Sequence, residues 1–598
     1  MTVRRVRRSQ TVSPFGVGAI IDVLGESFVA EDAGRWPWHD IIPMPRLAEI
    51  LGVTQIGAAP ADGLISYYRF PRWLFCPGCR RMEEWSPARE NKNTVPACTY
   101  CPKQRLVPMR FVAICGNGHL SDVSWWRWAH SSRFGTGGGA CRGSRLAFET
   151  SSGVGGGLRS TQVRCLTCNA ARSLEDLPTK DALRRVGQQC SGRQPWQIPS
   201  EEENCDQHLL AVQRGASSVY FPRTVSAIDI PPESDWNTRN DPAYRLRENS
   251  DFRWLVERRG HRSWEQRLDD LSEDEGVPKE DIRKLLDQVG AQEEVVPVAR
   301  SEDDIAPGEW DALTEPPAIA DPRDYFQARA TTIDAAAITG RLAKIAERLG
   351  FQVTGVTQVE RLREVRVLRG FERHTMQREV RANLRSRTGF LPGVEVLGEG
   401  FFLRFNEEAL AAWEQRPEVV ARGRGLALRK DARRELVWLP DPTPRFLLLH
   451  TFAHLLLRQT AYEAGYSTSS LRERLYVTNP KTDGPRMAGV LIYTAAGDSE
   501  GTLGGLVRLG EPERLVRLIA GALAASRWCS FDPVCGESTG QGPHGLSLAA
   551  CHACSLAPET SCEASNRLLD RGMVMNEEFG FFRDVLATIE DAYGTGTP

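Results

Sequence analysis

The 598-residue sequence lacks any run of about 18 apolar residues, so no segment is long enough to cross a membrane as a helix. It also lacks an excess of either charge. The 75 Lys and Arg residues balance 77 Asp and Glu residues, and the net charge of -2 excludes a uniformly basic nucleic-acid binder. The N-terminal MTVRRVRRSQ is basic, but no apolar segment follows it, so we expect no signal peptide and a cytoplasmic location.

The usual catalytic signatures are missing as well. There is no Gly-x4-Gly-Lys-Ser/Thr loop for ATP and no Gly-x-Ser-x-Gly nucleophile turn. His450 and His454 have the spacing of a zinc hydrolase, with Glu473 downstream, but His-Thr-Phe-Ala-His lacks the general-base glutamate of His-Glu-x-x-His. We therefore interpret both as buried, hydrogen-bonded histidines on a core helix. The sequence predicts no catalytic residue and no organic cofactor site.

Cysteine, in contrast, is plentiful, and most of the fifteen lie at metal-ligand spacing. Two thiolates two residues apart can bind a tetrahedral ion from one turn, and two further thiolates close the shell. In a reducing compartment such pairs indicate metal rather than disulfides. We predict about three structural Zn²⁺ ions, one for each of three sets: Cys76, Cys79, Cys98 and Cys101; Cys165, Cys168, Cys190 and Cys205; and Cys535, Cys551, Cys554 and Cys562.

The three sets differ in how closely their spacing defines them. The first is typical of a zinc ribbon, whereas the second ends in two single cysteines and the third has alternatives. Cys529 could replace Cys535, and His552 could replace a thiol. A further site could form from residues between the first two sets, unless its two cysteines are small buried hydrophobes. Its candidate ligands are Cys115, His119, Cys141 and His130.

The patterning indicates a multidomain α+β fold, with a zinc-ribbon-rich N-terminal half and a mixed α/β C-terminal zinc-binding domain. Helices are expected over 279–290, 333–349, 446–464, 469–475 and 513–526, and strands over 351–371 and 490–494; Thr443 and Gly465 are expected to cap the two ends of the 446–464 helix. Trp125, Trp126 and Trp128 are expected to form a small core beneath the metal loops. We expect five segments: 1–73, basic with a glycine-rich turn; 74–215, the ribbons; 216–330, ending in an acidic, proline-rich linker from 293 to 324; 331–440, mixed α/β; and 441–598, the C-terminal zinc-binding domain.

Arginine is clustered in two places, and these clusters are the candidate contacts to DNA phosphates. The first cluster is the N-terminal tail. The second would instead be a solvated strand face if Glu360 and Glu364 neutralise it. The candidates are Arg4, Arg5, Arg7 and Arg8 in the tail, and Arg361, Arg363, Arg366 and Arg369 in the second cluster.

Several segments together resemble one bacterial family. They are Arg7 to Gln10 with Phe15 to Ala19, the run from Cys115 to Val123, Arg214 to Pro222, and Leu362 to Phe371. In this order they are similar to DrmB, a core subunit of the DISARM anti-phage system. The second half resembles the zinc-binding domain at the C-terminus of some DNA-repair helicases, through His450 to His454, Gly501 to Gly505, and Cys551 to Asp570.

The resemblance implies a function that composition and spacing do not. It implies a non-catalytic subunit that partners DrmA, a superfamily 2 helicase-like ATPase, and engages single-stranded or overhang DNA beside a methyltransferase that marks self DNA. Two alternatives remain open. One is a zinc-dependent nuclease or hydrolase, such as a His-Asn-His nuclease built on His119, and the other is a pure protein–protein scaffold.

Overall fold

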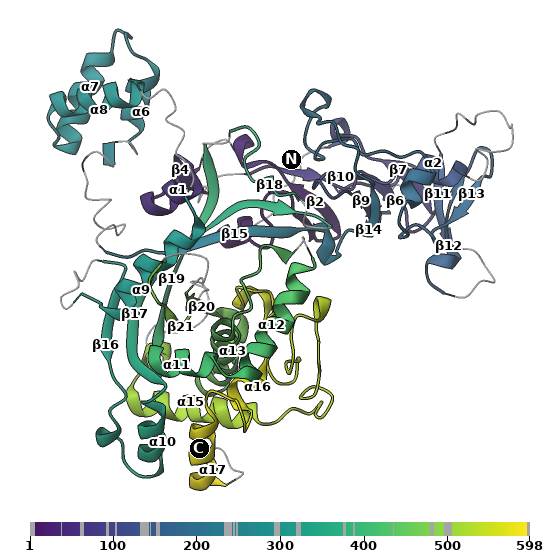
Figure 1. Ribbon diagram of the computed structural model, residues 1–598. Coiled ribbons are helices and arrows are strands. Elements are labelled where there is room, and N and C mark those ends of the chain that lie inside the picture. Colours follow the sequence, from purple (N-terminus) through teal and green to yellow (C-terminus); the bar gives the residue numbers. More distant parts are fainter. Residues whose placement is uncertain are drawn as a thin grey trace. The chain divides into compact units, whose positions relative to one another are not determined.

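The computed structural model divides into two compact units, each assembled from three separate stretches of chain (Figure 1). Unit 1 contains residues 1–42, 52–225 and 366–394, and unit 2 contains residues 43–51, 226–365 and 395–598. Helices and antiparallel strands occur in both, which confirms the predicted α+β class. The five segments predicted along the chain are a different division and stay a prediction.

The structure describes residues 6–594 apart from short internal ranges. These are 37–38, 60–64, 91–94, 102–103, 132–140, 142, 144, 151–155, 232–241, 243–244, 247–248, 292–299, 318–323, 375–377, 387–388, 434–435, 479–483 and 495–504. The predicted glycine-rich segment at Gly501 and part of the predicted acidic linker lie outside the described residues.

Unit 1 is built from short antiparallel strands whose connecting turns carry cysteines. A six-stranded sheet has the order β13-β12-β11-β7-β6-β8. Its strands are β6 (Trp73–Phe75), β7 (Arg81–Glu84), β8 (Val107–Pro108), β11 (Leu146–Thr150), β12 (Thr161–Cys165) and β13 (Ala171–Ser173). Two three-stranded sheets are formed by β1 (Ile20–Val23), β2 (Glu26–Ala30) and β5 (Tyr67–Arg69), and by β10 (Leu120–Asp122), β9 (Phe111–Ile114) and β14 (Leu210–Gln213).

The core of unit 1 lies beneath these turns. Helix α2 (Trp125–His130) buries Trp125 and Trp128 completely, against Phe111 of β9 and Val163 of β12. The predicted small tryptophan core is therefore confirmed. This core also reaches the metal-binding loops, since Cys115 and Cys165 belong to it and Cys141, Cys168, Cys190 and Cys205 pack against it.

A nine-stranded sheet contains the path β15-β17-β19-β21-β20, and the boundary between the units falls within its first three strands. These strands are β15 (Phe221–Ile228), β17 (Val353–Glu372), β19 (Phe390–Phe405), β21 (Ala488–Thr494) and β20 (Leu471–Val477). Off this path, β16 (Gln327–Thr331) and β18 (Val380–Arg381) pair with β17, and β3 (Asp40–Ile42) pairs with β4 (Gln55–Ala58), which pairs with β19.

In unit 2 both faces of the sheet are covered. All seven residues of β21 are buried, as in a strand sandwiched between layers. Val490 and Ile492 pack into the core of α13 (Pro444–Ala464), while Leu491 and Tyr493 point to the opposite face, toward α9 (Ile305–Thr314). This alternation follows from the two-residue period of a strand.

Helix α13 is the central helix of unit 2. Thr443 caps it by accepting a hydrogen bond from the Phe446 N–H, and Gly465 ends it in a left-handed conformation, as the sequence predicted. It contacts β20, β21, α15 (Pro512–Ser526) and α16 (Arg571–Met575). Fourteen of its residues are buried, which fits a helix that is apolar on nearly all sides.

The predicted helices are confirmed over 279–290 and 513–526, as α8 (Lys279–Ala291) and α15. The helix expected over 333–349 begins later, as α10 (Arg341–Leu349), and α9 forms inside the expected linker. The helix predicted over 469–475 is wrong, because this stretch is strand β20. Alternation of buried Leu471 and Glu473 with Arg472 gives a strand period, and pairing with β21 decides the outcome.

The remaining helices include α1 (Pro45–Leu51), α3 (Ala182–Arg185), α11 (Glu407–Glu414), α12 (Pro417–Asp431), α14 (Gly505–Leu509) and α17 (Arg583–Tyr593). Helices α6 (Ser250–Glu257), α7 (Trp264–Glu275) and α8 pack around an apolar core of their own. Within the described ranges, no helix combines the length and apolarity needed to cross a bilayer.

A buried carboxylate ties three elements of unit 2 together. Glu309 of α9 accepts hydrogen bonds from Arg474 Nε at 2.6 Å and from Tyr476 Oη at 2.9 Å, both on β20. It also accepts one from the Ile228 N–H at 2.7 Å. Glu309 is inaccessible to solvent, so each of these donors depends on it for a partner.

Replacing Glu309 with glutamine should therefore destabilise unit 2. The amide keeps the shape but leaves the Arg474 guanidinium buried without its counter-charge, which typically costs about 3–5 kcal/mol. We expect a lower urea midpoint for hydrogen exchange of the β20 amides. Glu347→Gln, at an exposed position of α10, is the matched control and should leave the midpoint unchanged. Equal midpoints in the two variants would contradict this role for Glu309.

Candidate metal centres

Five groups of four side chains place their ligand atoms within 4.8 Å of one another among the described residues. Unit 1 holds the ribbon cluster (Cys76, Cys79, Cys98, Cys101), the outer cluster (Cys115, His119, Cys190, Cys205) and the inner cluster (His130, Cys141, Cys165, Cys168). Two of the names describe order along the chain: the ligands of the inner cluster lie between His119 and Cys190 of the outer cluster. Unit 2 holds the C-terminal cluster (Cys529, Cys535, Cys551, Cys554) and the histidine cluster (His450, His454, Glu473, Cys562).

The ribbon cluster is formed by two tight turns. Cys76 follows strand β6, and the chain returns through Arg80, whose φ of 64° lets β7 begin at once. The N–H of Cys79 donates to Cys76 Sγ at 3.4 Å, and the N–H of Cys101 donates to Cys98 Sγ at 3.3 Å. The structure thus brings together the four cysteines that the sequence placed in the first set.

The inner cluster repeats the same turn. Cys165 ends β12, Asn169 takes a φ of 59°, and the Asn169 N–H donates to the Cys165 carbonyl at 3.0 Å. His130, from the end of α2, places Nε2 3.3 Å from Cys168 Sγ. Its other nitrogen, Nδ1, lies 2.7 Å from the Trp126 carbonyl, which leaves Nε2 as the ligand atom. Cys141 completes the group, 3.9 Å from Cys165.

The outer cluster is built on a different turn, between β9 and β10. Gly118 has a φ of 81°, and a Cβ there would lie 2.4 Å from the Val380 side chain. His119 Nδ1 is thereby held 3.4 Å from Cys115 Sγ and 3.5 Å from Cys190 Sγ. Buried Arg373 donates to the Gly118 carbonyl at 2.9 Å and secures the same turn.

This arrangement corrects the second predicted set. Cys165 and Cys168 do not meet Cys190 and Cys205, because the first pair lies at the turn between β12 and β13, whereas the second lies in loops that reach Cys115 and His119 at the turn between β9 and β10. The further site suggested by Cys115, His119, Cys141 and His130 also divides between the outer and inner clusters. Sequence spacing missed this because a ligand that stands alone in a loop carries no information about its partner. A signal was available: His119 and His130 each supply the single imidazole that a three-cysteine set lacks.

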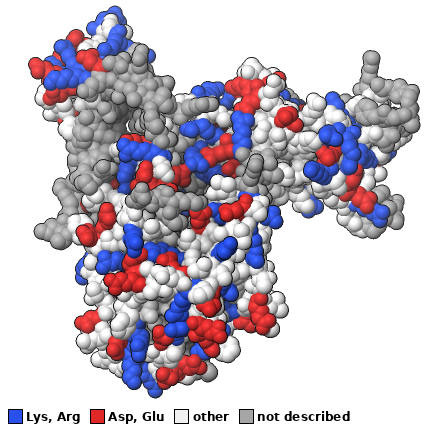
Figure 2. All heavy atoms as spheres, in the orientation of Figure 1, with Lys and Arg blue, Asp and Glu red and all other residues white. Residues whose placement is uncertain are grey.

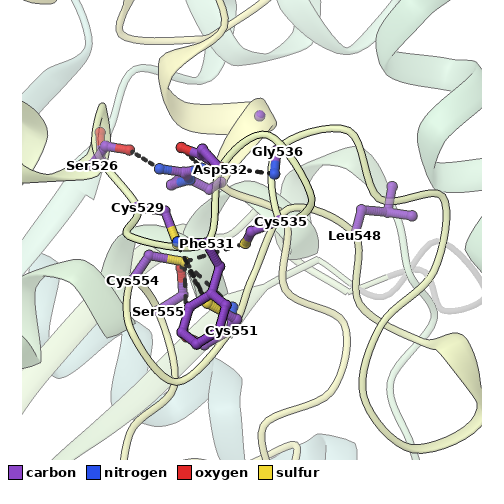
Figure 3. Close-up of polar contacts among 12 residues, drawn as sticks. Ser526, Cys529, Phe531, Asp532, Cys535, Gly536, Leu548, Cys551, Cys554 and Ser555 are labelled. Carbon is purple, nitrogen blue, oxygen red and sulfur yellow. Dashed lines mark hydrogen bonds and ion pairs between the residues drawn. The ribbon is translucent and has the colours of Figure 1, made fainter.

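The C-terminal cluster lies after α15. Figure 3 shows the sulfur atoms of Cys529, Cys535, Cys551 and Cys554 pointing toward one another. Cys529 Sγ lies 3.4 Å from Cys551 Sγ, and Cys535 Sγ lies 3.8 Å from Cys554 Sγ. Cys529 and Cys535 are thus both members, although the sequence treated them as alternatives. His552 is exposed and is not part of the group.

The loop that carries these first two cysteines is anchored from below. Arg571, fully buried on α16, binds the Asp532 carboxylate at 2.8 and 3.0 Å and the Ser526 carbonyl at 3.0 Å. Asp532 Oδ1 in turn accepts the Gly536 N–H at 2.9 Å (Figure 3). These hydrogen bonds hold the loop, and with it Cys529 and Cys535, in place without a contribution from an ion.

The third predicted set included Cys562, but the structure places this residue in the histidine cluster. Its sulfur lies 3.2 Å from His450 Nε2, and Glu473 Oε1 lies 3.2 Å from the same nitrogen. His450 and His454 are buried and hydrogen-bonded, as predicted. The sequence analysis associated Glu473 with these histidines only as a hydrolase pattern, which it set aside, and it assigned Cys562 to another set.

The thiol pKa values show why these groups suit a cation. In the outer cluster, a hydrogen bond from Cys190 and the neighbouring His119 lower the pKa of Cys115 to about 4, although burial opposes this. The pKa of Cys190 is raised, because a second thiolate would face the first. In the ribbon cluster burial also opposes ionisation, yet backbone N–H groups lower the pKa of Cys76, while the pKa of Cys98 is raised. Each cluster therefore holds one thiolate easily, and a dication would release the remaining protons.

The predicted DNA contacts are scattered. Arg4 and Arg5 lie outside the described residues, and Arg7 and Arg8 are exposed, with Arg8 paired to Asp40 at 2.7 Å. Arg363 is a correction: its guanidinium is buried against Asp229 at 3.0 Å and the Pro43 carbonyl at 3.1 Å, so no phosphate can reach it.

The other three arginines of the second cluster keep some exposure. Arg361 is exposed, and Arg366 and Arg369 are half-buried, with Arg369 paired to Glu379. On the face drawn in Figure 2, Lys and Arg are interspersed with Asp and Glu. The charge on that face is therefore mixed, as the overall balance of the sequence indicated.

Comparison with known proteins agrees with this division of the chain. Residues 452–555 match a family model described as the MrfA Zn-binding domain, which spans all four ligands of the C-terminal cluster. Residues 7–221, which contain the three clusters of unit 1, match a model described as a domain of unknown function, DUF8724.

One relative covers both regions. The sequence is 30% identical over 500 residues to a DISARM protein DrmB from Bacillus paralicheniformis, a match that spans 80% of this chain and 82% of the relative. The resemblance noted from the motifs is thereby confirmed over most of the length. The chain belongs to the DrmB family of DISARM proteins.

Proposed function

We propose that this chain is a non-catalytic, zinc-braced subunit that presents DNA to a helicase-like ATPase partner during anti-phage defence in the cytoplasm. The observation that carries the proposal is the ligand count. Each cluster in the described parts of the chain offers four side-chain ligands, and a four-coordinate ion in such a shell has no open position for water or substrate. Membership of the DrmB family supports the DISARM setting.

Zinc is the cation that fits the four cysteine-rich clusters. Each has either four cysteines or three cysteines and one histidine, soft ligands that select Zn²⁺ in a tetrahedral shell. In a tetrahedral zinc thiolate site, ligand atoms lie about 3.3–3.8 Å apart, given Zn–S near 2.3 Å and Zn–N near 2.0 Å. The separations of 3.3 and 3.9 Å in the inner cluster lie within about 0.1 Å of that range. In this proposal the ions cross-link loops and take no part in a reaction.

DNA contact is proposed for the exposed arginines alone. Arg7 and Arg8 in unit 1 and Arg361 in unit 2 present guanidinium groups to solvent, where phosphates can replace their counterions. The mixed charge of the chain gives weak binding by the isolated subunit, so a DNA groove shared with the ATPase is the arrangement we favour.

A nuclease built on His119 is the rival hypothesis, and the geometry disfavours it. A general base needs a nitrogen free to take a proton from water. His119 Nδ1 instead faces two sulfurs, Nε2 lies 4.0 Å from the Glu203 carboxylate, and the ring is buried. A pure scaffold remains the other alternative, and DNA binding separates it from the proposal.

The cluster assignments predict a specific pattern of cysteine protection. In Cys190→Ser, the outer cluster should lose its ion, so Cys115 and Cys205 become open to alkylation while Cys165 and Cys168 stay protected. His130→Asn is the mirror variant and should expose Cys141, Cys165 and Cys168 instead. Peptide mapping by mass spectrometry measures the alkylation of each cysteine in both variants. Reactive Cys165 and Cys168 in Cys190→Ser would restore the grouping expected from the sequence.

The DNA proposal predicts a salt-dependent weakening of binding in the Arg7→Glu/Arg8→Glu variant. Affinity of the complex with its ATPase partner for overhang DNA should fall, and the slope of log affinity against log salt should shrink by about 0.7 for each single-strand phosphate that the tail no longer neutralises. Arg159→Glu/Arg184→Glu changes the same charge at exposed positions of unit 1 and serves as the control. Unchanged affinity and slope in the tail variant would exclude the tail as a DNA-binding element.

The closed shells predict no turnover by this chain alone. With Mg²⁺ and either ATP or DNA, the purified subunit should show no multiple-turnover hydrolysis above background. Hydrolysis that co-purifies with the wild type and disappears in His119→Ala or His450→Ala would make the chain an enzyme and overturn the proposed role.

A further inference from the structure

The histidine cluster has an arrangement that a hydrogen-bond network does not explain. His450 and His454 lie one turn apart on α13, so both rings face strand β20. Glu473 lies on β20 between Leu471 and Leu475, and this face of the strand packs against α13. Cys562 comes from the segment that follows the C-terminal cluster. All four residues are buried, and the two histidines and Glu473 are completely inaccessible.

The Nδ1 atom of each ring, which faces away from the cluster, lies at hydrogen-bonding distance from a backbone carbonyl. His450 Nδ1 lies 3.2 Å from the Leu568 carbonyl, and His454 Nδ1 lies 2.8 Å from the Ser555 carbonyl. A carbonyl accepts only from N–H, so the proton of each neutral ring sits on Nδ1. Both Nε2 atoms therefore point lone pairs into the cluster, which is the second-shell pattern of metal-bound histidine.

The groups opposite these nitrogens are acceptors as well. Glu473 Oε1 lies 3.2 Å from His450 Nε2 and 3.5 Å from His454 Nε2. Two polar atoms at the centre, His454 Nε2 and Glu473 Oε2, are buried without a hydrogen-bond partner. Lone pairs gathered in this way repel one another unless a cation lies between them, and an unsatisfied buried polar atom typically costs about 1–3 kcal/mol.

We propose that His450, His454, Glu473 and Cys562 form a fifth, structural zinc site in the core of unit 2. The separations of 3.2 Å from His450 Nε2 to Glu473 Oε1 and to Cys562 Sγ, and of 3.5 Å from His454 Nε2 to Glu473 Oε1, fit a tetrahedral shell, whose N–O and N–S edges are about 3.3–3.6 Å. The donor set of two nitrogens, one oxygen and one sulfur is one that Zn²⁺ accepts.

The charge of the ligand set also suits its depth. One carboxylate, one thiolate and two neutral imidazoles cancel the two charges of Zn²⁺, so the loaded site is neutral and its burial carries little desolvation cost. The same four ligands without an ion leave an anionic pair in the core or require charged histidines there. His450 and Cys562 lie outside the residues that match the zinc-binding family model, so this site is separate from the C-terminal cluster.

The site would join α13 and β20, which are neighbours along the chain, to the distant segment 555–570. Helix α13, strand β20 and the 555–570 segment each supply at least one ligand or hold a ligand's second nitrogen. The Glu563 N–H donates to Glu473 Oε1 at 3.2 Å, and the Asn566 N–H donates to Cys562 Sγ at 3.2 Å, so backbone donors support both anionic ligands. No position remains for a substrate, so the site braces the core.

Native mass spectrometry of the full chain tests this by counting zinc. Glu473→Gln keeps shape and removes the ligand charge, and Cys562→Ser removes the thiolate. Each should hold one zinc fewer than the wild type. Thr460→Val is the matched control. Thr460 lies on α13 with the two histidines, is fully buried, and its hydroxyl has no hydrogen-bond partner. This variant should keep the wild-type zinc count. The proposal is overturned if Glu473→Gln retains the wild-type count, or if Thr460→Val loses zinc equally.

A measurement on the wild type keeps the test independent of variant folding. In ¹¹³Cd-substituted protein, chemical shift reports the number of thiolate ligands, because each sulfur moves the resonance downfield. We expect one resonance far upfield of the signals from the four cysteine-rich clusters, absent from Glu473→Gln. If every wild-type resonance lies in the region of three or four thiolates, no ion occupies this cluster and the inference fails. Neither the zinc count nor the ¹¹³Cd spectrum depends on DNA binding, so these measurements test the zinc site and leave the proposed function to its own tests.

Discussion

Thiols whose sulfur atoms lie within 4.8 Å of one another do not all ionise easily unless a cation lies among them, and unit 1 contains three groups where this constraint applies. The strands of its own three sheets are two to five residues long, and the cysteines of its outer and inner clusters pack into or against the tryptophan core of α2. Metal ligation, as proposed above, would add cross-links between these short strands and loops, in the way that it stabilises small ribbon modules. Unit 2 has the opposite balance, with a large apolar core around α13 and only two clusters among its described residues.

The four cysteine-rich clusters lie at a similar depth, each with two buried and two half-buried ligands, and the histidine cluster is deeper. The ribbon and C-terminal clusters, whose four thiolates keep two net negative charges around Zn²⁺, each have two half-buried cysteines close to solvent. The outer cluster would keep one negative charge, and buried Arg373, bound to the Gly118 carbonyl of its turn, lies on the side away from water. The histidine cluster would be neutral and is the most deeply buried. Charge that water cannot screen is thus avoided in the choice of ligand.

The sequence predicted the α+β class, helix α13 with both of its caps, and the ribbon cluster, because each depends on neighbours within about one element. Ligand grouping was less accessible. Cys190 and Cys205 stand alone in loops, and their partners are fixed by the pairing of β9 with β10 and β14, a long-range event. Glu473 was weighed with His450 and His454 only as a hydrolase pattern and set aside, and the assignment of Cys562 to the third cysteine set left the group without its fourth member. Arg363 showed that charge clustering along a chain does not establish exposure, since Asp229 holds it inside.

The inner and outer clusters are nested along the chain like one pair of brackets inside another. All four inner ligands, from His130 to Cys168, lie between His119 and Cys190 of the outer cluster. During synthesis the inner site is therefore complete before Cys190 and Cys205 have emerged, and closing it shortens the loop that the outer site must later span. A chain that loaded its ions in the reverse order could pair Cys165 and Cys168 with Cys190 and Cys205, a four-thiolate shell that is chemically adequate but belongs to no native sheet. The order of emergence from the ribosome thus favours the native ligand set over one in which the wrong cysteines share an ion.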